Sequence, residues 1–262
     1  MSNKLLQNKK GLICGITNSK SIGWGIAKVL AEHGAEIIFT YQNESILKRI
    51  KPLANEIGTK LLLECDITNE QAIDKTFQQI EKHCGNIDFC IHSIAFADKK
   101  ELKGMYINTS KDNFKNAMEI SCYSFTALAQ RSAKLMTNGG SMLTMSYYGA
   151  KKFVPNYNVM GLCKAALEAS VRYLAMDLGR FNIRVNAISA GPVKTMAASG
   201  IEHFAHILNW NSTHSPLMRS VTLEDIGKSA LFLVSSLSSG ITGEVLMVDA
   251  GYHIIGVPCN NK

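Results

Sequence analysis

A tyrosine and a lysine in NYNVMGLCKAALEASVRYLA, residues 156–175, form the pair of side chains in this sequence best suited to chemistry. Tyr157 offers a phenol that donates a hydrogen bond, and Lys164 offers a cation that holds a hydroxyl or an anion. Seven residues of helix turn through about 700° and rise about 10.5 Å, so the spacing predicts both side chains on one helical face. Tyr147 follows the apolar run 141–146 and should open onto the same region. A packed tyrosine and a solvated lysine are the alternative for an isolated pair.

A second stretch, GITNSKSIGWGIA at 15–27, has the features of a phosphate-binding loop. We expect Gly15 to make the turn, and Ser21 to cap the following helix and hold a phosphate oxygen through its hydroxyl. The N–H of Ile22 should point at the pyrophosphate, while Gly23 and Gly25 allow close packing of helix on sheet. The loop is longer than the G-x-G-x-x-G fingerprint. A glycine turn without a ligand therefore stays open.

The ends of the next two apolar runs predict which dinucleotide binds. Gln42 follows the second run and can hydrogen-bond a ribose hydroxyl, but it carries no charge to pair with a 2′-phosphate. Arg49 lies about two helical turns further on. Asp66 and Ile67 end the third run, where an adenine could be read and its ring packed, although Asp66 is equally well placed to form a plain turn. NAD is favoured over NADP.

The elements that must position these residues alternate along the chain. The apolar runs that read as strands are 11–16, 36–41, 60–67, 87–94, 141–146, 183–189 and 243–249. Helical patterns lie between them at 22–33, 43–57, 112–136, 156–175 and from Leu223, and another runs to Cys84 with Thr68 as its N-cap. Strands that are apolar on nearly every residue and separated by helices indicate a parallel sheet covered on both faces. The fold class predicted is α/β, a single doubly wound Rossmann-type domain over residues 1–262 with seven strands. Ligands bind such sheets outside the carboxyl ends of the strands.

Composition narrows the class of function. The chain has 262 residues, 46% of them apolar, with no signal-peptide pattern and no apolar run of about 18 residues, so we expect a cytoplasmic protein without a membrane span. The seven cysteines form no CxxC and the seven histidines no HExxH, so no metal site is expected. The net charge is +7, but no basic stripe alternates with aromatic residues, which argues against nucleic acid. Solvated lysines and an acidic protein partner remain as explanations of the charge.

Several further segments occur in a fixed order along the chain. They are FTYQN at 39–43, CDIT at 65–68, HSIAFA at 92–97, LTMSYYGA at 143–150, PNYNVMGLCKAALEA at 155–169, RVNAISAGPVKTMAASGI at 184–201 and GITGEVLMVDAGY at 240–252. With the long first loop, this order closely resembles the NADH-dependent enoyl-acyl-carrier-protein reductases of bacterial fatty-acid synthesis, a divergent branch of the short-chain dehydrogenases. The resemblance covers about residues 8–256. In most short-chain dehydrogenases the tyrosine lies four residues before the lysine, where this chain has Met160. In the resembled branch it lies seven before.

The resemblance implies a role for each residue of the site. Tyr147, Tyr157 and Lys164 are implied as the catalytic residues, with Ala97 and both tyrosines contacting the substrate. NADH is the implied cofactor, with contacts at Gly15, Ser21, Ile22, Gln42, Asp66, Ile67, Ile94, Lys164, Val193, Lys194, Thr195, Met196 and Ala197. The implied partner is an acidic acyl carrier protein that delivers the enoyl substrate, and the implied assembly is a homotetramer.

The segment 193–218 is expected to act as a lid over the acyl chain. Apolar residues at 201, 204, 205 and 208 fall on one helical face. A helix packed in the core would show the same pattern and is the alternative. The expected reaction is hydride transfer to the β-carbon of a trans-2-enoyl thioester, with Tyr157 stabilising the enolate oxygen. Two other classes stay open: a ketoacyl or other carbonyl reductase with the same fold, and a non-catalytic protein that senses nucleotides or binds a partner.

Overall fold

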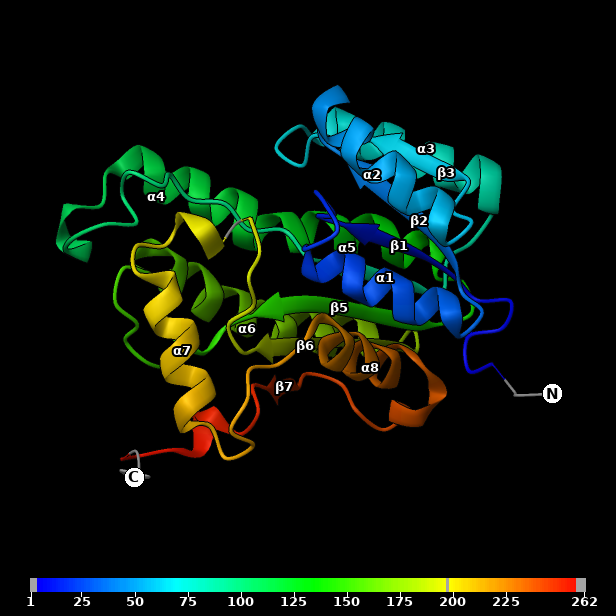
Figure 1. The fold of residues 1–262 in the computed structure, drawn as a ribbon. Coiled ribbons are helices and arrows are strands. Elements are labelled where there is room, and N and C mark those ends of the chain that lie inside the picture. Colours follow the sequence, from blue (N-terminus) through cyan, green and yellow to red (C-terminus); the bar gives the residue numbers. More distant parts are fainter. Residues whose placement is uncertain (1–3, 197, 258–262) are drawn as a thin grey trace.

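A parallel β-sheet runs through the middle of the molecule in the computed structural model, which describes residues 4–196 and 198–257 (Figure 1). Within these residues the sheet has seven strands in the order β3-β2-β1-β4-β5-β6-β7, and every neighbouring pair is parallel. The strands are β1 Lys10–Cys14, β2 Glu36–Tyr41, β3 Leu61–Glu64, β4 Phe89–His92, β5 Gly140–Ser146, β6 Ile183–Ala190 and β7 Val245–Val248. The predicted doubly wound α/β class is confirmed, and so is each predicted strand.

Helices cover both faces of this sheet. The helices of the described chain are α1 Ile22–Glu32, α2 Glu44–Glu56, α3 Glu70–Cys84, α4 Lys111–Met118, α5 Ser124–Leu135, α6 Val159–Gly179, α7 Phe204–His214 and α8 Leu223–Val234. Side chains from α1, α2 and α8 build the core on one face, and side chains from α3, α5 and α6 build the core on the other. Figure 1 shows α1 and α8 in front of the sheet, with α4 and α7 beyond the ends of its central strands. Short 3₁₀ turns occur at Tyr106–Asn108, Tyr148–Ala150, Ala198–Gly200, Ser236–Ser238 and Tyr252–Ile254.

Several of the predicted helix limits are wrong, and two of them concern α3 and the segment 112–136. Thr68 does not cap α3, because the side chain of Asn69 accepts from the N–H of Ala72 at 3.1 Å. The single helix predicted over 112–136 is interrupted by a π-helical turn at Glu119–Tyr123, between α4 and α5. A π turn inserts one extra residue into the helix and often marks a functional site. Amphipathic periodicity does not detect such an insertion.

The strand order creates the crevice in which a ligand can bind. β1 pairs with β2 on one side and with β4 on the other. The strands after β1 are therefore added first toward one edge of the sheet and then, from β4 on, toward the other edge. In the register, Cys14 pairs with His92 and His92 pairs with Thr144, which brings the carboxyl ends of β1, β4 and β5 together. Most of the functional residues predicted from the sequence lie in the loops that follow these strand ends, where ligands bind in such sheets.

Candidate active site

The loop after β1 is shaped by Gly15. Its φ is +96°, and a Cβ at this position would lie 2.1 Å from the carbonyl oxygen of Ser93, so only glycine fits. Gly23 faces Ile16 and Ile13 and lets α1 approach β1, as predicted. Gly25 instead allows a close contact with Leu223 of α8, so its predicted packing against the sheet is wrong.

Ser21 has the predicted position but a different local role. It is the N-cap residue of α1, yet its hydroxyl does not bond the helix. Oγ accepts from the N–H of Thr17 at 3.0 Å and from that of Asn18 at 3.1 Å, which closes the loop on itself. The first turn of α1, which begins at Ile22, contains no acidic residue. A helix N-terminus of this kind favours an anion, so the loop fits the pyrophosphate of a dinucleotide.

The residues predicted to hold the adenosine end follow β2 and β3. Gln42 is exposed directly after β2. Asp66 Oδ1 accepts from the backbone N–H and the hydroxyl of Thr68 at 3.0 and 2.8 Å, which supports its role as a turn former. Ile67 and Ile94 are partly buried and pack against the same core. Adenine contact by Asp66 and Ile67 remains a prediction.

Tyr157 lies outside the helix that was predicted to carry it. α6 begins at Val159, and Tyr157 belongs to the turn before it. The prediction of one helical face for Tyr157 and Lys164 is therefore wrong, although both belong to the same site region. Asn156 and Asn158 flank the tyrosine with φ of +60° and +42°, and asparagine tolerates positive φ better than most residues. The two asparagines were the sequence signal for a turn at this point.

Two phenols meet at the carboxyl end of β5. The rings of Tyr147 and Tyr157 have centroids 5.0 Å apart and cross at 70°. Gly149 makes room for this pair, because a Cβ there would lie 2.5 Å from Cδ1 of Tyr157. Burial raises the pKa of Tyr147 to about 12 and raises the pKa of Tyr157 well above its ordinary value, helped in each case by a neighbouring tyrosine. Both phenols are therefore neutral donors at physiological pH.

Lys164 is buried beside this end of β5. Its side chain is 5% exposed, and Nζ donates to the carbonyl oxygen of Met145 at 2.7 Å. Burial lowers the pKa of the ammonium to about 8, so the lysine is still mostly protonated at pH 7. One turn later, Glu168 accepts from the hydroxyl of Ser146 at 2.7 Å. The cation thus has one N–H fixed to the backbone and two others for a ligand.

His92 is a buried residue of this region that sequence reasoning missed. Nδ1 lies 2.8 Å from the hydroxyl of Thr144, and Nε2 lies 2.8 Å from that of Ser124. Ser124 gives its own hydrogen to the carbonyl of Ile120, so it accepts from Nε2–H, and Thr144 donates to Nδ1. Burial and the nearby Lys164 lower the pKa of the imidazole to about 3. His92 is therefore neutral and links β4 to Thr144 of β5 and Ser124 of α5.

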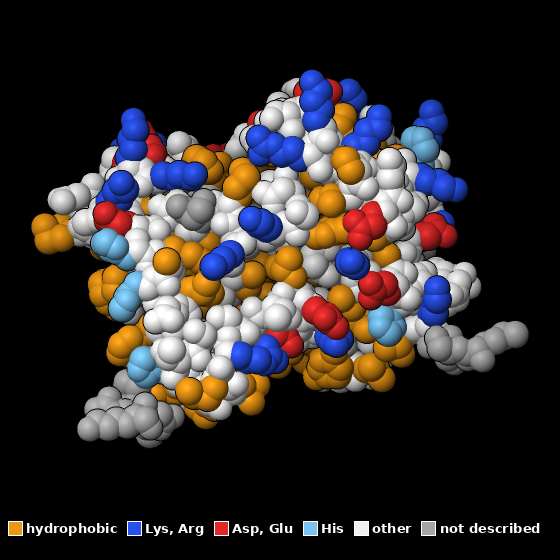
Figure 2. Space-filling model, in the orientation of Figure 1, with side chains coloured by type: hydrophobic (Ala, Val, Ile, Leu, Met, Phe, Trp, Pro, Cys, Tyr) orange, Lys and Arg blue, Asp and Glu red, His pale blue; other side chains and the backbone are white. Residues whose placement is uncertain are grey.

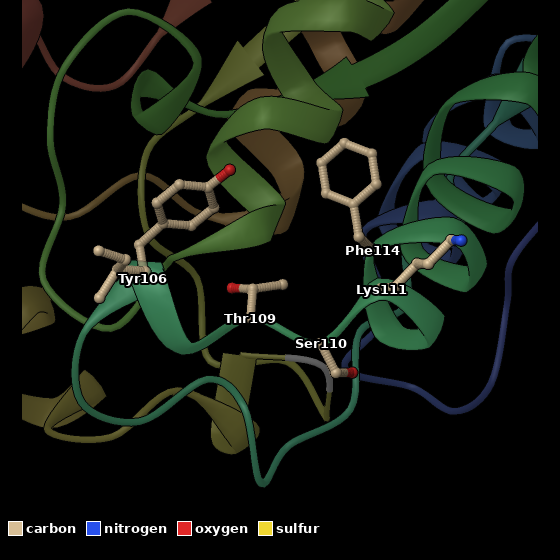
Figure 3. Close-up of a pocket in the computed structure, with 6 residues that line it drawn as sticks. Tyr106, Thr109, Ser110, Lys111 and Phe114 are labelled. Atoms are coloured by element: carbon tan, nitrogen blue, oxygen red, sulfur yellow. The ribbon is translucent and has the colours of Figure 1, made fainter.

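A small third core lies between the loop after β4, α4 and α6. It contains Ala97, Leu102, Tyr157 and Met160, with Ile201 packed against it. Ala97 and Tyr157 thus share one apolar wall, as expected for residues that contact an acyl chain. Nearby, Tyr106 and Phe114 lie on opposite sides of a hollow (Figure 3). Its volume is about 410 Å³. The rest of its lining comes from Ile107, Thr109, Ser110 and Lys111.

The segment after β6 covers the phosphate loop. The sulfur of Met196 lies 3.2 Å from Nδ2 of Asn18 and 3.8 Å from a guanidinium nitrogen of Arg49. Val193 is half-buried and Lys194 is exposed, and Thr195 accepts from the N–H of Ala198 at 3.0 Å. Ala197, predicted to contact the cofactor, lies outside the described residues.

α7 is a half-exposed helix. Phe204 and Leu208 are partly buried, but Ala205, assigned to the same apolar face, is exposed, and so is Trp210. The only residue of α7 that is fully buried within the described part of the chain is Asn211. A core helix would bury a whole face. The exposure of α7 therefore favours a lid over a core helix.

Comparisons with known proteins identify the family of this chain. The family model described as Enoyl-(Acyl carrier protein) reductase matches residues 15–253. The chain belongs to this family. An NADH-dependent enoyl-acyl-carrier-protein reductase of Rhizobium meliloti is 57% identical to it over 97% of this chain and 93% of the relative.

Solved structures of other enoyl-acyl-carrier-protein reductases have the same fold. The reductase of Anaplasma phagocytophilum, solved in complex with NAD, matches with a TM-score of 0.95 and 54% identity over 98% of both chains. The reductase of Bacillus cereus, solved with NADP+ and an indole naphthyridinone, matches with a TM-score of 0.95 and 46% identity over 97% of this chain and all of that one. The family inferred from the order of the sequence segments is confirmed.

Within the described residues, two kinds of site are not found. No group of three or more His, Cys, Asp or Glu side chains there is arranged to hold a metal ion. No helix of the described chain has the length and apolar character needed to span a membrane.

Proposed function

We propose that this chain is an NADH-dependent enoyl-acyl-carrier-protein reductase that reduces the trans-2 double bond of enoyl thioesters in fatty-acid synthesis. The observation that carries the proposal is a pair of neutral phenols in a chain of this family. The ring centroids of Tyr147 and Tyr157 lie 5.0 Å apart. The first loop has Gly15 at its turn, and the first helical turn of α1 has no acidic residue that would repel a phosphate. The residues present therefore fit a dinucleotide.

In the proposed mechanism, Tyr157 stabilises negative charge on the substrate. NADH held by the first loop and Lys164 would supply the hydride for the β-carbon of the enoyl thioester. Negative charge would then build on the thioester oxygen, and a proton from solvent at the α-carbon would complete the reduction. A neutral phenol aimed at that oxygen donates a hydrogen bond that strengthens as the charge develops, which for one good donor is worth about 3 to 4 kcal/mol. Tyr147 shapes the pocket from the other side of the ring pair and contacts the thioester.

Lys164 acts on the cofactor in this proposal. Its two remaining N–H groups hold a hydroxyl of the nicotinamide ribose, and the bond to the carbonyl of Met145 fixes its direction. Orientation of the hydride donor is itself a large part of the rate gain in such reactions. The remaining cofactor contacts are proposed at Gly15, Ser21, Ile22, Gln42, Asp66, Ile67, Ile94, Val193, Lys194, Thr195, Met196 and Ala197.

The preference for NADH rests on Gln42. Its uncharged amide accepts or donates to a ribose hydroxyl but leaves a 2′-phosphate without a cation. Arg49 contacts Met196, at the edge of the proposed lid. If Arg49 turned toward the ribose instead, it would favour NADPH.

The first experiment compares substrates and cofactors. We expect NADH absorbance at 340 nm to fall when a crotonyl thioester is added and to stay constant with an acetoacetyl thioester. We also expect kcat/KM for NADH to exceed that for NADPH. Consumption of NADH with acetoacetyl thioester alone would indicate a carbonyl reductase, and constant absorbance with both would indicate a non-catalytic nucleotide-binding protein. Equal kcat/KM for the two cofactors would contradict the role of Gln42.

The domain organisation proposed is one catalytic domain over residues 1–262, with a substrate lid at about 193–218. The segment crosses the phosphate loop at Met196 and presents the half-exposed helix α7, which supports the lid. Closure of such a lid excludes water from the reacting atoms.

The proposed partner is an acyl carrier protein, which is acidic. Lys99, Lys100 and Lys103 are exposed in the loop after β4, and the side chain of Lys99 lies against Gly200 at the start of the lid. Lys194, exposed on the lid segment, would add to this patch. Arg219, a further basic candidate near the lid, is paired with Asp225 at 2.6 Å and contributes less. Figure 2 shows Lys and Arg side chains spread over several elements of one face, so ordinary solvation explains part of the +7 charge.

Salt dependence tests this lysine patch. Attraction between exposed charges is screened over about 8 Å at physiological ionic strength and acts mainly on the association rate. We expect kcat/KM for a carrier-protein substrate to fall steeply with added salt, and that for an uncharged crotonyl thioester without a carrier to change little. Lys99→Glu with Lys100→Glu should flatten the first slope, whereas Lys75→Glu on α3 should not. Equal slopes for both substrates would contradict steering.

The proposed assembly is a homotetramer in the cytoplasm. Large apolar side chains are exposed on and after α6, including Tyr173 at 76% and Met176 at 82%, and Phe181 is exposed as well. Apolar groups spaced along one helix in this way support contact between copies of the chain.

A further inference from the structure

The backbone on both sides of Tyr157 is strained. Asn156 has a φ of +60°, and Asn158 has a φ of +42° with a ψ of −125°, a region that the Cβ of an L-residue disfavours. Residues in such regions are destabilising on their own and persist only where surrounding contacts hold them. The direction of the phenol is therefore set by this turn, because Tyr157 precedes the first residue of α6.

Each asparagine spends its side-chain amide on a distant segment. Nδ2 of Asn158 donates to the carbonyls of Glu101 at 3.0 Å and Gly104 at 3.4 Å, in the loop after β4. Nδ2 of Asn156 donates to the carbonyl of Glu202 at 3.3 Å, two residues before α7. One partner is the wall that carries Ala97, and the other is the start of the lid. A turn that only needed positive φ would not require either bond.

The two partner segments differ in rigidity. Both the N–H and the carbonyl of Phe96 bond the hydroxyl of Ser121 in the π turn, at 2.9 and 3.0 Å. The N–H of Asp98 donates to Asn113 at 2.9 Å, and the carboxylate of Glu101 accepts from Ser110, the N-cap residue of α4. Asn158 therefore holds on to a fixed wall. By contrast, the side chain of Asn156 reaches the lid through one long hydrogen bond.

We propose that Asn156 and Asn158 are positioning residues that clamp Tyr157 between the two walls of the acyl pocket. Asn158 sets the direction of the phenol against the fixed wall, and Asn156 couples the phenol to the closed lid. The inference rests on the proposed function, since it assigns the phenol of Tyr157 to the thioester oxygen.

Two variants of Asn158 and one control variant of Asn182 separate the effect of the side-chain amide from the effect of the backbone conformation. Asn158→Gly removes the amide but adopts positive φ without strain, whereas Asn158→Ala removes the amide and keeps the strain. We expect both to lower kcat at least about 10-fold on a crotonyl thioester, because a small misplacement of a catalytic group has effects of this size or larger. The dissociation constant for NADH, measured by fluorescence, should stay within about 2-fold of wild type. Asn182→Gly, at a φ of +58° before β6, is the matched control and should leave kcat unchanged.

The outcomes distinguish the clamp from a structural role and from the proposed function itself. Wild-type kcat in Asn158→Gly with loss only in Asn158→Ala would mean that this position serves backbone conformation alone. Since glycine carries no strain there, Asn158→Gly remains informative even if the alanine variant does not fold. Should Tyr157→Phe and Tyr147→Phe both keep wild-type kcat, the proposed function is wrong. Should Tyr157→Phe lose activity while Asn158→Gly keeps it, the clamp alone is wrong.

Asn156→Gly tests the coupling to the lid. We expect this variant to raise KM, relative to wild type, more for a long-chain enoyl thioester than for a crotonyl thioester. Amide hydrogen exchange at His206 and Ile207, whose N–H groups bond the carbonyl of His203, should become faster while exchange in β5 and β6 is unchanged. Unchanged exchange in this stretch of α7 would overturn the coupling.

Discussion

Replacing Tyr157 by phenylalanine is expected to lower kcat about 10²- to 10³-fold, the range measured for removal of one donor to a developing oxyanion. The ring fits the space left by Gly149, so the variant keeps its packing and loses only the hydroxyl. Because the pKa of Tyr157 is raised well above its ordinary value by burial, the wild-type group acts as a neutral donor across the working range of pH. Steady-state kinetics with a crotonyl thioester measure this effect.

Two comparisons make the result for Tyr157→Phe specific. The dissociation constant for NADH should stay within about 2-fold of wild type, because the phenol is assigned to the substrate. Tyr123→Phe, which loses only an exposed hydrogen bond to Glu70, should leave kcat unchanged. A kcat for Tyr157→Phe that stays close to wild type would assign the donor role to Tyr147 instead, and Tyr147→Phe would then carry the loss.

The sheet was predictable because burial leaves a direct mark on sequence. Each strand lies between two helical layers, so runs such as EIIFTY at 36–41 are apolar on both faces, and the observed β2 has the same limits. The carboxyl ends of such strands collect the ligand loops, which is why Gly15 and Tyr147 were placed correctly. These features follow from periodicity and topology alone.

The details of the site depend on contacts between distant segments, which periodicity does not encode. Tyr157 was assigned to the same helix as Lys164, yet α6 begins two residues later. Its turn is stabilised by amide contacts with carbonyls about 46 to 57 positions away in sequence. Likewise the hydroxyl of Ser21 closes its own loop in place of capping α1, a choice between two local partners that residue type alone leaves undecided.

Lys164→Met should weaken NADH binding about 10- to 100-fold, because a hydrogen bond to a charged group contributes about 1.5 to 3 kcal/mol. Methionine preserves the length and apolar stem of the lysine, so packing in the buried site changes little. Fluorescence titration with NADH measures the dissociation constant, and Lys75→Met on α3 is the exposed control. An unchanged dissociation constant for Lys164→Met would remove the lysine from the ribose site.

The same variant should reveal the cost of burying the cation. The pKa of Lys164 is about 8 in the folded protein and about 10.4 in an unfolded chain. Between these values the unfolded state binds more protons, so the lysine's contribution to the free energy of unfolding becomes more favourable as pH rises from 8 toward 10. At 1.36 kcal/mol per pKa unit the change is about 3 kcal/mol.

Urea unfolding of wild type and Lys164→Met at several pH values, without NADH, tests this sign. Groups that titrate in both proteins cancel in the difference between their free energies of unfolding. We expect wild type to gain about 2.5 kcal/mol of this relative to the variant between pH 7 and pH 10, since at pH 7 only wild type keeps a desolvated ammonium beside Met145. A difference that stays constant with pH would mean that the ammonium is not destabilised by burial. The pKa of Lys164 would then be the same in the folded and the unfolded protein, and burial of the ammonium would not destabilise the fold.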